Sequence, residues 1–235
     1  MGEGLAYYGA KNSNSYQPQM ICTISTTGAT ASYSAGYTSN NSGYWQYEEM
    51  TWFSLLAVGN YVHCTFGYPY NGASWFIKMD LTTKSITSDI NTRLGGVGGN
   101  KLYVPSGATL NEYNDDGSST GSSWVLPSAP ISLGTTSGNV IWWNASAGMV
   151  WFDYTTNARG FVASTPGAGF PASSRRPVIL GAVAYWMHSD NTKMVAFNML
   201  TGQWKLDDLA TSRTRRFGIG VGNGKLWIPT TVTPP

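Results

Sequence analysis

Short apolar strands separated by glycine-rich turns recur along the whole chain. Five segments share one layout, in which a glycine-rich apolar strand is followed by a tight turn and a second strand carrying an aromatic residue or histidine. They span residues 53–63, 94–103, 131–142, 178–185 and 217–227. Equivalent apolar positions on the second strand lie 40, 39, 43 and 42 residues apart, at Val62, Leu102, Ile141, Ala184 and Leu226. This regular spacing predicts a tandem repeat of about forty residues.

A second hairpin follows each copy of this layout. An alternating or apolar strand leads to Asp or Asn, and a threonine-containing turn comes next. Segments 76–84, 150–157, 194–202 and 20–28 fit this frame, and 110–117 fits it loosely. The side chain of Asp80, Asp153 or Asn198 can accept hydrogen bonds from the turn amides. We therefore expect these three residues to form turns and to have no catalytic role.

Four strands per forty residues, joined by short turns, are the layout of a β-propeller blade. We predict one all-β domain over residues 1–235. Glycines crowd the first strand of the repeat, as fits innermost strands that converge on a narrow channel, where side chains would collide. Aromatic side chains of the second strand should pack between neighbouring blades, and they are Tyr103, Trp142, Tyr185 and Trp227. His63 occupies the same position in its repeat, so we expect it to be packed and not catalytic.

The number of blades follows from how the repeats begin and end. The sequence contains five innermost strands, five third strands and six candidates for the second strand, because residues 5–9 also qualify. The chain starts and stops partway through a repeat. A ring leaves no open edge only if both termini close its last blade. Five four-stranded blades, the last one composite, are the preferred count, and six are the alternative.

One stretch of the chain resembles a known repeat family. Residues 197–204 read Phe-Asn-Met-Leu-Thr-Gly-Gln-Trp, and residues 213–227 continue through arginines and a glycine-rich strand to Gly-Lys-Leu-Trp. This order resembles the kelch-type repeat, which runs from a Tyr-Asp hairpin and a Trp through an arginine to a glycine-rich strand and Gly-Lys-Ile-Tyr. The paired glycines of that family after the second strand are replaced here, at 229–230 and 105–106, by Pro-Thr and Pro-Ser. The resemblance implies a propeller.

Composition narrows the class of protein. The chain has 235 residues, of which 42% are hydrophobic and 14% aromatic, enough for a large core. Charged residues make up 11%, and the net charge of +2 provides no basic face for nucleic acid. No apolar run approaches the roughly 20 residues of a membrane span. A polar surface of Ser, Thr, Asn and Gln is common in secreted, cell-surface and virion proteins.

The ends and the cysteines add two expectations. No basic and then apolar leader follows Met1, so we expect synthesis without a cleaved secretion signal. Cys22 and Cys64 are too few for a disulfide scaffold or a zinc site. We expect both to be buried free thiols on strands.

Catalytic chemistry finds little support in the sequence. A glycoside hydrolase needs two or three convergent carboxylates, but all 12 acidic residues fall in turns, outer strands or loops. His63 and His188 lie on second strands of different repeats, so they form no metal-ligand cluster. Residues 95–99 resemble a phosphate-binding loop, but no helix follows them. We predict no enzyme activity, no cofactor and no metal site, with a glycoside hydrolase as the remote alternative.

Binding residues are expected on the loops, because loops on a rigid scaffold usually carry function. The rich loops lie at 37–52, 67–72, 115–121 and 166–177. Arginines precede three of the innermost strands and are absent before the other two. Their positive charge is therefore expected to be unevenly distributed around the ring. The candidate interface residues are Arg93, Arg175, Arg176, Arg213, Arg215, Tyr68, Tyr70, Asn71, Tyr44 and Trp52.

Loops of unequal length suit one partner per loop better than one ligand per blade. We therefore expect a structural interaction protein of a bacteriophage virion, in the tail, in the neck or attached to the capsid. Its partners would be other virion or surface proteins or copies of itself, joined after synthesis in the host cytoplasm. The alternative is an extracellular, lectin-like propeller that binds a glycan or receptor, because sugars stack on exposed aromatic rings.

Overall fold

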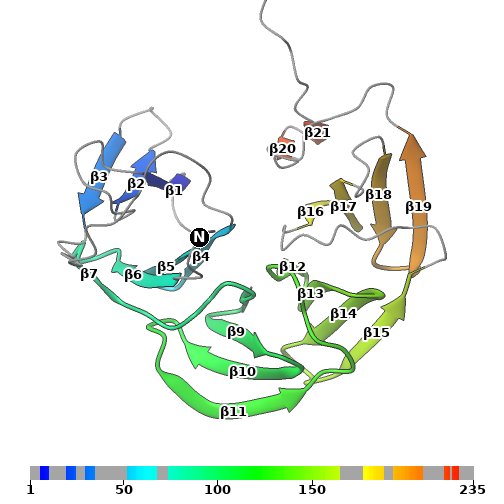
Figure 1. Cartoon of the computed structure of the whole chain (residues 1–235), viewed down its shortest axis with the longest axis horizontal. Helices are drawn as coiled ribbons and strands as arrows, with labels where there is room; N and C mark the ends of the chain where they lie inside the picture. The colour runs from blue at the N-terminus through cyan, green and yellow to red at the C-terminus, as the bar shows by residue number, and fades with distance from the viewer. Residues whose placement is uncertain are drawn as a thin grey trace, which may run out of the picture. The chain divides into compact units, whose positions relative to one another are not determined.

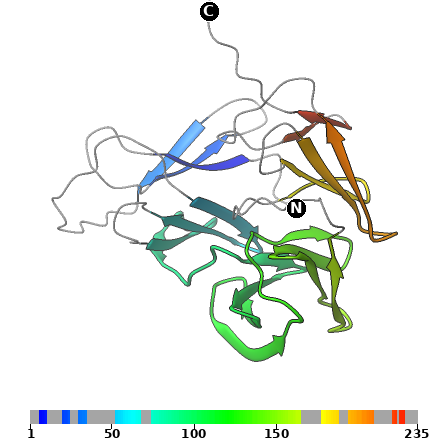
Figure 2. The ribbon, with the colours of Figure 1, turned by 45° about the vertical axis from the view of Figure 1, so that its right-hand side comes forward.

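The computed structural model describes the backbone of residues 6–10, 20–24, 30–34, 52–67, 74–164, 177–187, 193–208, 220–222 and 224–227. Every regular element in these ranges is a β-strand, so the predicted all-β class is confirmed. The strands form four sheets of four strands, one of three and one of two. They can be followed in Figure 1 and, from a second direction, in Figure 2.

Each four-stranded sheet is a meander in which consecutive strands are neighbours. The first strands are β4 (Trp52–Val58), β8 (Gly96–Gly98), β12 (Thr135–Ser137) and β16 (Val178–Leu180). The second strands are β5 (Tyr61–Gly67), β9 (Lys101–Ser106), β13 (Val140–Ala145) and β17 (Val183–Met187). The third strands are β6 (Ser74–Asp80), β10 (Thr109–Asn114), β14 (Gly148–Asp153) and β18 (Lys193–Asn198). The fourth strands are β7 (Ile86–Ser88), β11 (Ser119–Val125), β15 (Arg159–Ala163) and β19 (Gln203–Asp208).

The two smaller sheets hold the partial repeats at the chain ends. The first consists of β1 (Ala6–Ala10), β2 (Met20–Ile24) and β3 (Thr30–Ser34), and the second of β20 (Gly220–Gly222) and β21 (Lys225–Trp227). In the repeat frame, β1 and β21 are second strands and β20 is a first strand. The predicted five first, six second and five third strands are therefore all present.

The chain divides into two compact units. Unit 1 contains Met1–Arg93 together with Tyr113–Ser118, and unit 2 contains Leu94–Glu112 together with Ser119–Pro235. The turn between β10 and β11 thus belongs to unit 1 together with the last two residues of β10, whereas the rest of β10 and all of β11 belong to unit 2.

The turns from the third to the fourth strand confirm the predicted role of Asp80, Asp153 and Asn198. Their side-chain oxygens each accept two backbone N–H groups of the turn, for example from Thr155 at 2.8 Å and Thr156 at 3.1 Å on Asp153. Hydrogen bonds from the Thr155 hydroxyl and backbone lower the pKa of the Asp153 carboxyl. The side chains of Asp80, Asp153 and Asn198 therefore stabilise the turns by hydrogen bonds to the backbone.

Each of these three turns ends in a left-handed residue, and in the first copy that residue is Lys84. Its φ is 61°, like that of Asn157, and Gly202 has 69° at the same place. A side chain in this region costs about 1 kcal/mol, and asparagine tolerates it better than lysine. Lys84→Gly should therefore raise the free energy of unfolding by about 0.5–1 kcal/mol in urea titrations. Asn157→Gly is the matched control and should gain less free energy of unfolding. A lower urea midpoint for Lys84→Gly than for the wild type would contradict this expectation.

Neighbouring sheets of unit 2 pack face to face through alternating side chains. On β13, Ile141 and Trp143 enter a core with Tyr103, whereas Trp142 faces a second core with Phe197. The ring centroids of Trp142 and Phe197 lie 5.5 Å apart. The predicted packing between sheets is thus confirmed for Tyr103 and Trp142.

Trp227 departs from the predicted packing of the second-strand aromatics. Its side chain on β21 is 60% exposed. This strand belongs to the two-stranded sheet, in which no third or fourth strand is described to provide a broad packing face. The sequence position alone is therefore insufficient to bury this aromatic residue.

Glycines on the first strands allow the sheets to approach closely. A Cβ placed on Gly134 would lie 2.9 Å from the Cα of Gly96 and 2.7 Å from the indole nitrogen of Trp143. The Gly134 N–H also donates to the Gly95 carbonyl at 2.9 Å. At this pair of sheets the glycines therefore allow contact between the backbones of adjacent sheets, as predicted.

Candidate functional site: the loop ends and the His63 cluster

Every four-stranded sheet has two different ends. We call the end with the first-to-second and third-to-fourth turns the tight-turn end, and the opposite end, with the second-to-third turns and the connections to the next sheet, the loop end. In the repeat frame, which extends to the two partial sheets, connections at the tight-turn end contain two to five residues, and those at the loop end contain two to seventeen. The long stretches 35–51, 164–177 and 209–219 all join strands at the loop end.

Two of the ten candidate interface residues have a described backbone, and strand order places both at the loop end. Arg93 lies in the connection between β7 and β8. Trp52 is the first residue of β4, and its side chain falls outside the described residues. The other eight candidates fall outside the described residues: Tyr44, Tyr68, Tyr70, Asn71, Arg175, Arg176, Arg213 and Arg215.

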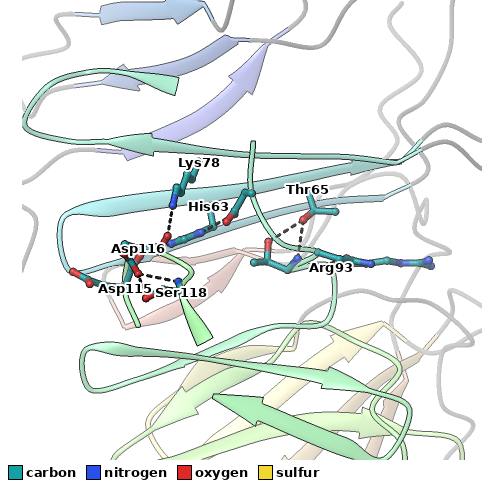
Figure 3. Close-up of polar contacts among 10 residues, drawn as sticks. His63, Thr65, Lys78, Arg93, Asp115, Asp116 and Ser118 are labelled. Atoms are coloured by element: carbon teal, nitrogen blue, oxygen red, sulfur yellow. Dashed lines mark hydrogen bonds and ion pairs between the residues drawn. The ribbon is translucent and has the colours of Figure 1, made fainter. Parts of the chain in front are cut away.

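Arg93 is held in place by its own connection. Its side chain is half-buried, and its backbone N–H donates to the side-chain oxygen of Asn91 at 3.1 Å. The preceding Thr92 is bound to β5, because its N–H and hydroxyl reach the Thr65 hydroxyl at 3.1 and 2.8 Å. Figure 3 shows the Arg93 side chain extending away from His63 and Asp116.

A buried polar cluster surrounds His63 on β5, within unit 1 (Figure 3). The imidazole is fully buried and lies between two oxygen atoms. Its Nδ1 is 2.7 Å from Oδ2 of Asp89, and its Nε2 is 2.7 Å from the backbone carbonyl of Asp115. His63 therefore joins the connection after β7 to the turn between β10 and β11.

The Asp89 carboxylate is as buried as the ring that it contacts. Its side chain is 1% exposed, and its second oxygen, Oδ1, has no hydrogen-bond partner among the described residues. A Cβ on Gly117 would lie 2.9 Å from that oxygen, and Gly117 has a φ of 82°. Only glycine meets both demands, so the turn can approach Asp89 closely.

The same turn is also held by Lys78. The Lys78 ammonium on β6 donates to the Asp116 carbonyl and lies 5.5 Å from the centre of the Tyr61 ring. Hydrogen bonds from Ser118 lower the pKa of the Asp116 carboxyl. The segment from Asp115 to Ser118, which looks like a binding loop in the sequence, is thus a tight turn bonded to β5 and β6.

The contacts of this cluster are those of a packed structural residue. Both nitrogens of His63 already have partners, and the ring has no exposed surface to meet a substrate. The expectation of a packed histidine is confirmed. Burial raises the pKa of the neighbouring Cys64 thiol to about 12, and this cysteine is free and buried as expected.

Sequence reasoning missed the partners of His63. A signal for them is present at the repeat position of His63, where the next two repeats have the aromatic residues Tyr103 and Trp142. A histidine at a packed position needs hydrogen-bond partners. Asp89 and Asp115 are the carboxylate and the turn residue that supply them.

No group of three or more His, Cys, Asp or Glu residues in the described ranges has the arrangement of a metal site. In the same part of the chain there is no helix long and apolar enough to cross a membrane.

Comparison with known proteins identifies the fold. No family model matches the chain, and no curated protein matches it. A streptogramin B lyase structure aligns with a TM-score of 0.56 and 13% identity, covering 95% of this chain and 79% of that one. A chain of the nidogen–laminin complex aligns with a TM-score of 0.51 and 12% identity, covering 88% and 76%. Both are β-propeller proteins. Together with the four-stranded meanders, these alignments show that the chain has the β-propeller fold.

Proposed function

We propose that this chain is a non-catalytic interaction protein that binds protein partners through its loop ends, as a component of a bacteriophage virion. The observation that carries the proposal is the division between the two ends of the sheets. Connections at the tight-turn end are short, and three of them are closed by the same Asx hydrogen bonds. Those at the loop end differ in length and sequence, as in scaffolds that present binding loops.

The uneven arginines favour a protein partner over a small ligand repeated in each blade. Arginines precede β8, β16 and β20, whereas the stretches directly before β4 and β12 have none. Arginine is enriched at interface hot spots because its planar group makes several hydrogen bonds while its stem packs. A protein with an asymmetric surface, or a second copy of this chain, fits such a set.

The composition supports the virion setting. With 11% charged residues and a net charge of +2, the chain depends on Ser, Thr, Asn and Gly for its polar surface. Such surfaces suit a protein that is built into a larger assembly. The proposed partners are other virion proteins and copies of this chain, and the proposed location is the assembled particle.

Co-sedimentation of the chain with the virions to which it is proposed to belong tests the proposal. A variant with Arg175→Ala, Arg176→Ala and Arg213→Ala should lose at least about a hundredfold in particle binding, because it lacks interface anchors. A control with Lys84→Asn, Lys101→Gln and Lys225→Gln removes three positive charges from the tight-turn end and should bind normally.

Two results would contradict the proposal. One is equal particle binding by both triple variants, which would separate binding from the loop end. The other is selective retention on a glycan array that Tyr68→Ala and Tyr70→Ala abolish, which would assign the loop end to a sugar. Unchanged circular dichroism of each variant confirms that folding is preserved.

A further inference from the structure

The two contacts of the His63 ring require two hydrogens. Both Asp89 Oδ2 and the Asp115 carbonyl oxygen lie 2.7 Å from a ring nitrogen. A carbonyl only accepts, and so does a carboxylate, whereas a neutral imidazole has a single N–H. Both contacts are therefore hydrogen bonds at the same time only when the pair holds one proton more than a neutral ring beside a carboxylate. In that state the extra proton lies between Nδ1 and Oδ2, and Nε2–H donates to the Asp115 carbonyl.

We infer that His63 and Asp89 form a proton-dependent latch that holds the turn of residues 113–118 against β5. When the shared proton leaves, the ring has one N–H for two acceptors, and one contact must break. Both side chains are buried, so leaving an acceptor without a donor here costs free energy. Since the latched turn binds the extra proton, rising pH favours the released turn.

The other ionisable groups around the ring do not account for the proposed pH dependence. Lys78 from β6 donates to Asp116 of the same turn, and the ring of Tyr61 lies 6.3 Å from the His63 ring. Burial raises the pKa of the Cys64 thiol to about 12, and burial together with nearby carboxylates raises the pKa of Tyr61. These two groups stay neutral over the working range of a histidine. Asp115 faces the ring with its backbone oxygen, and its carboxylate accepts from the Asn60 N–H at 3.4 Å.

Hydrogen exchange of the turn amides between about pH 5 and about pH 9 tests the latch. After correction for intrinsic rates, protection of residues 113–118 should fall about three- to tenfold as the pH rises, as expected for one lost hydrogen bond. The turn at 154–157 is the internal reference, because Asp153 closes it without a histidine. Constant protection of residues 113–118 in the wild type would overturn the inference.

Asp89→Asn is the decisive variant. Its amide N–H can donate to Nδ1 while a neutral ring donates from Nε2 to Asp115, so both contacts persist without the titrating proton. Protection of the turn should then be the same at both ends of the pH range. An Asp89→Asn protein with the wild-type pH dependence would overturn the latch.

A measurement on the wild type keeps the test independent of that variant. The ring nitrogen signals of His63, observed by NMR, should change over the same pH interval as the exchange of residues 113–118. If the ring titrates while the exchange rates stay constant, the turn is held by other contacts and the inference is wrong.

Discussion

Replacing Trp143 with alanine should lower the free energy of unfolding by about 3–5 kcal/mol. The indole is fully buried on β13, in the core shared with Tyr103 and Phe152. Its ring also fills the space that two glycines leave, because a Cβ on Gly96 would lie 3.2 Å from it and a Cβ on Gly134 would lie 2.7 Å away. Removal therefore opens a cavity at the junction of two sheets and deprives the Leu94 carbonyl of a donor at 2.8 Å.

Urea unfolding with Trp227→Ala as the control measures this effect. Trp227 is the same residue type but is 60% exposed, so its loss should change stability by less than about 0.5 kcal/mol. Equal effects of the two substitutions would show that the core between these sheets does not hold unit 2 together.

Breaking the His63–Asp89 pair should be about as costly. His63→Leu leaves a carboxylate that is 1% exposed without its partner, and a lost buried partner costs about 3–5 kcal/mol. The double variant His63→Leu, Asp89→Leu should recover most of that loss, because no buried charge then remains.

The double-mutant cycle in urea gives the coupling energy directly. Destabilisation by the double variant that equals the sum of the two single effects would mean that the residues act independently. The latch requires a clear deviation from additivity, in the direction of recovery.

The sequence was sufficient for the fold because local rules act in each repeat. The spacing of Val62, Leu102, Ile141 and Ala184 located the second strands, and Asp80 and Asp153 marked the turns before the fourth strands. Both signals can be read along the sequence, because the spacing compares one repeat with the next and the turn residues act within a few positions. The exposed Trp227 shows their limit, because burial requires a facing sheet that the repeat pattern alone does not provide.

The candidate site was harder to predict because its contacts are distant in sequence. Asp89 is 26 residues from His63, and Asp115 is 52 residues away. Neither residue stands out locally, because aspartate in a turn has an ordinary structural explanation. The same ambiguity made 115–121 look like a binding loop. The loop-end assignment, by contrast, follows directly from strand order.

Hydroxyl-radical footprinting of the chain in free and particle-bound form tests the interaction account most directly. Binding through the loop ends predicts protection in residues 35–51, 68–73, 165–176 and 209–219. The tight turns at 81–84, 154–157 and 199–202 should react equally in both forms. Protection of those tight turns, with unchanged loop-end connections, would contradict the account.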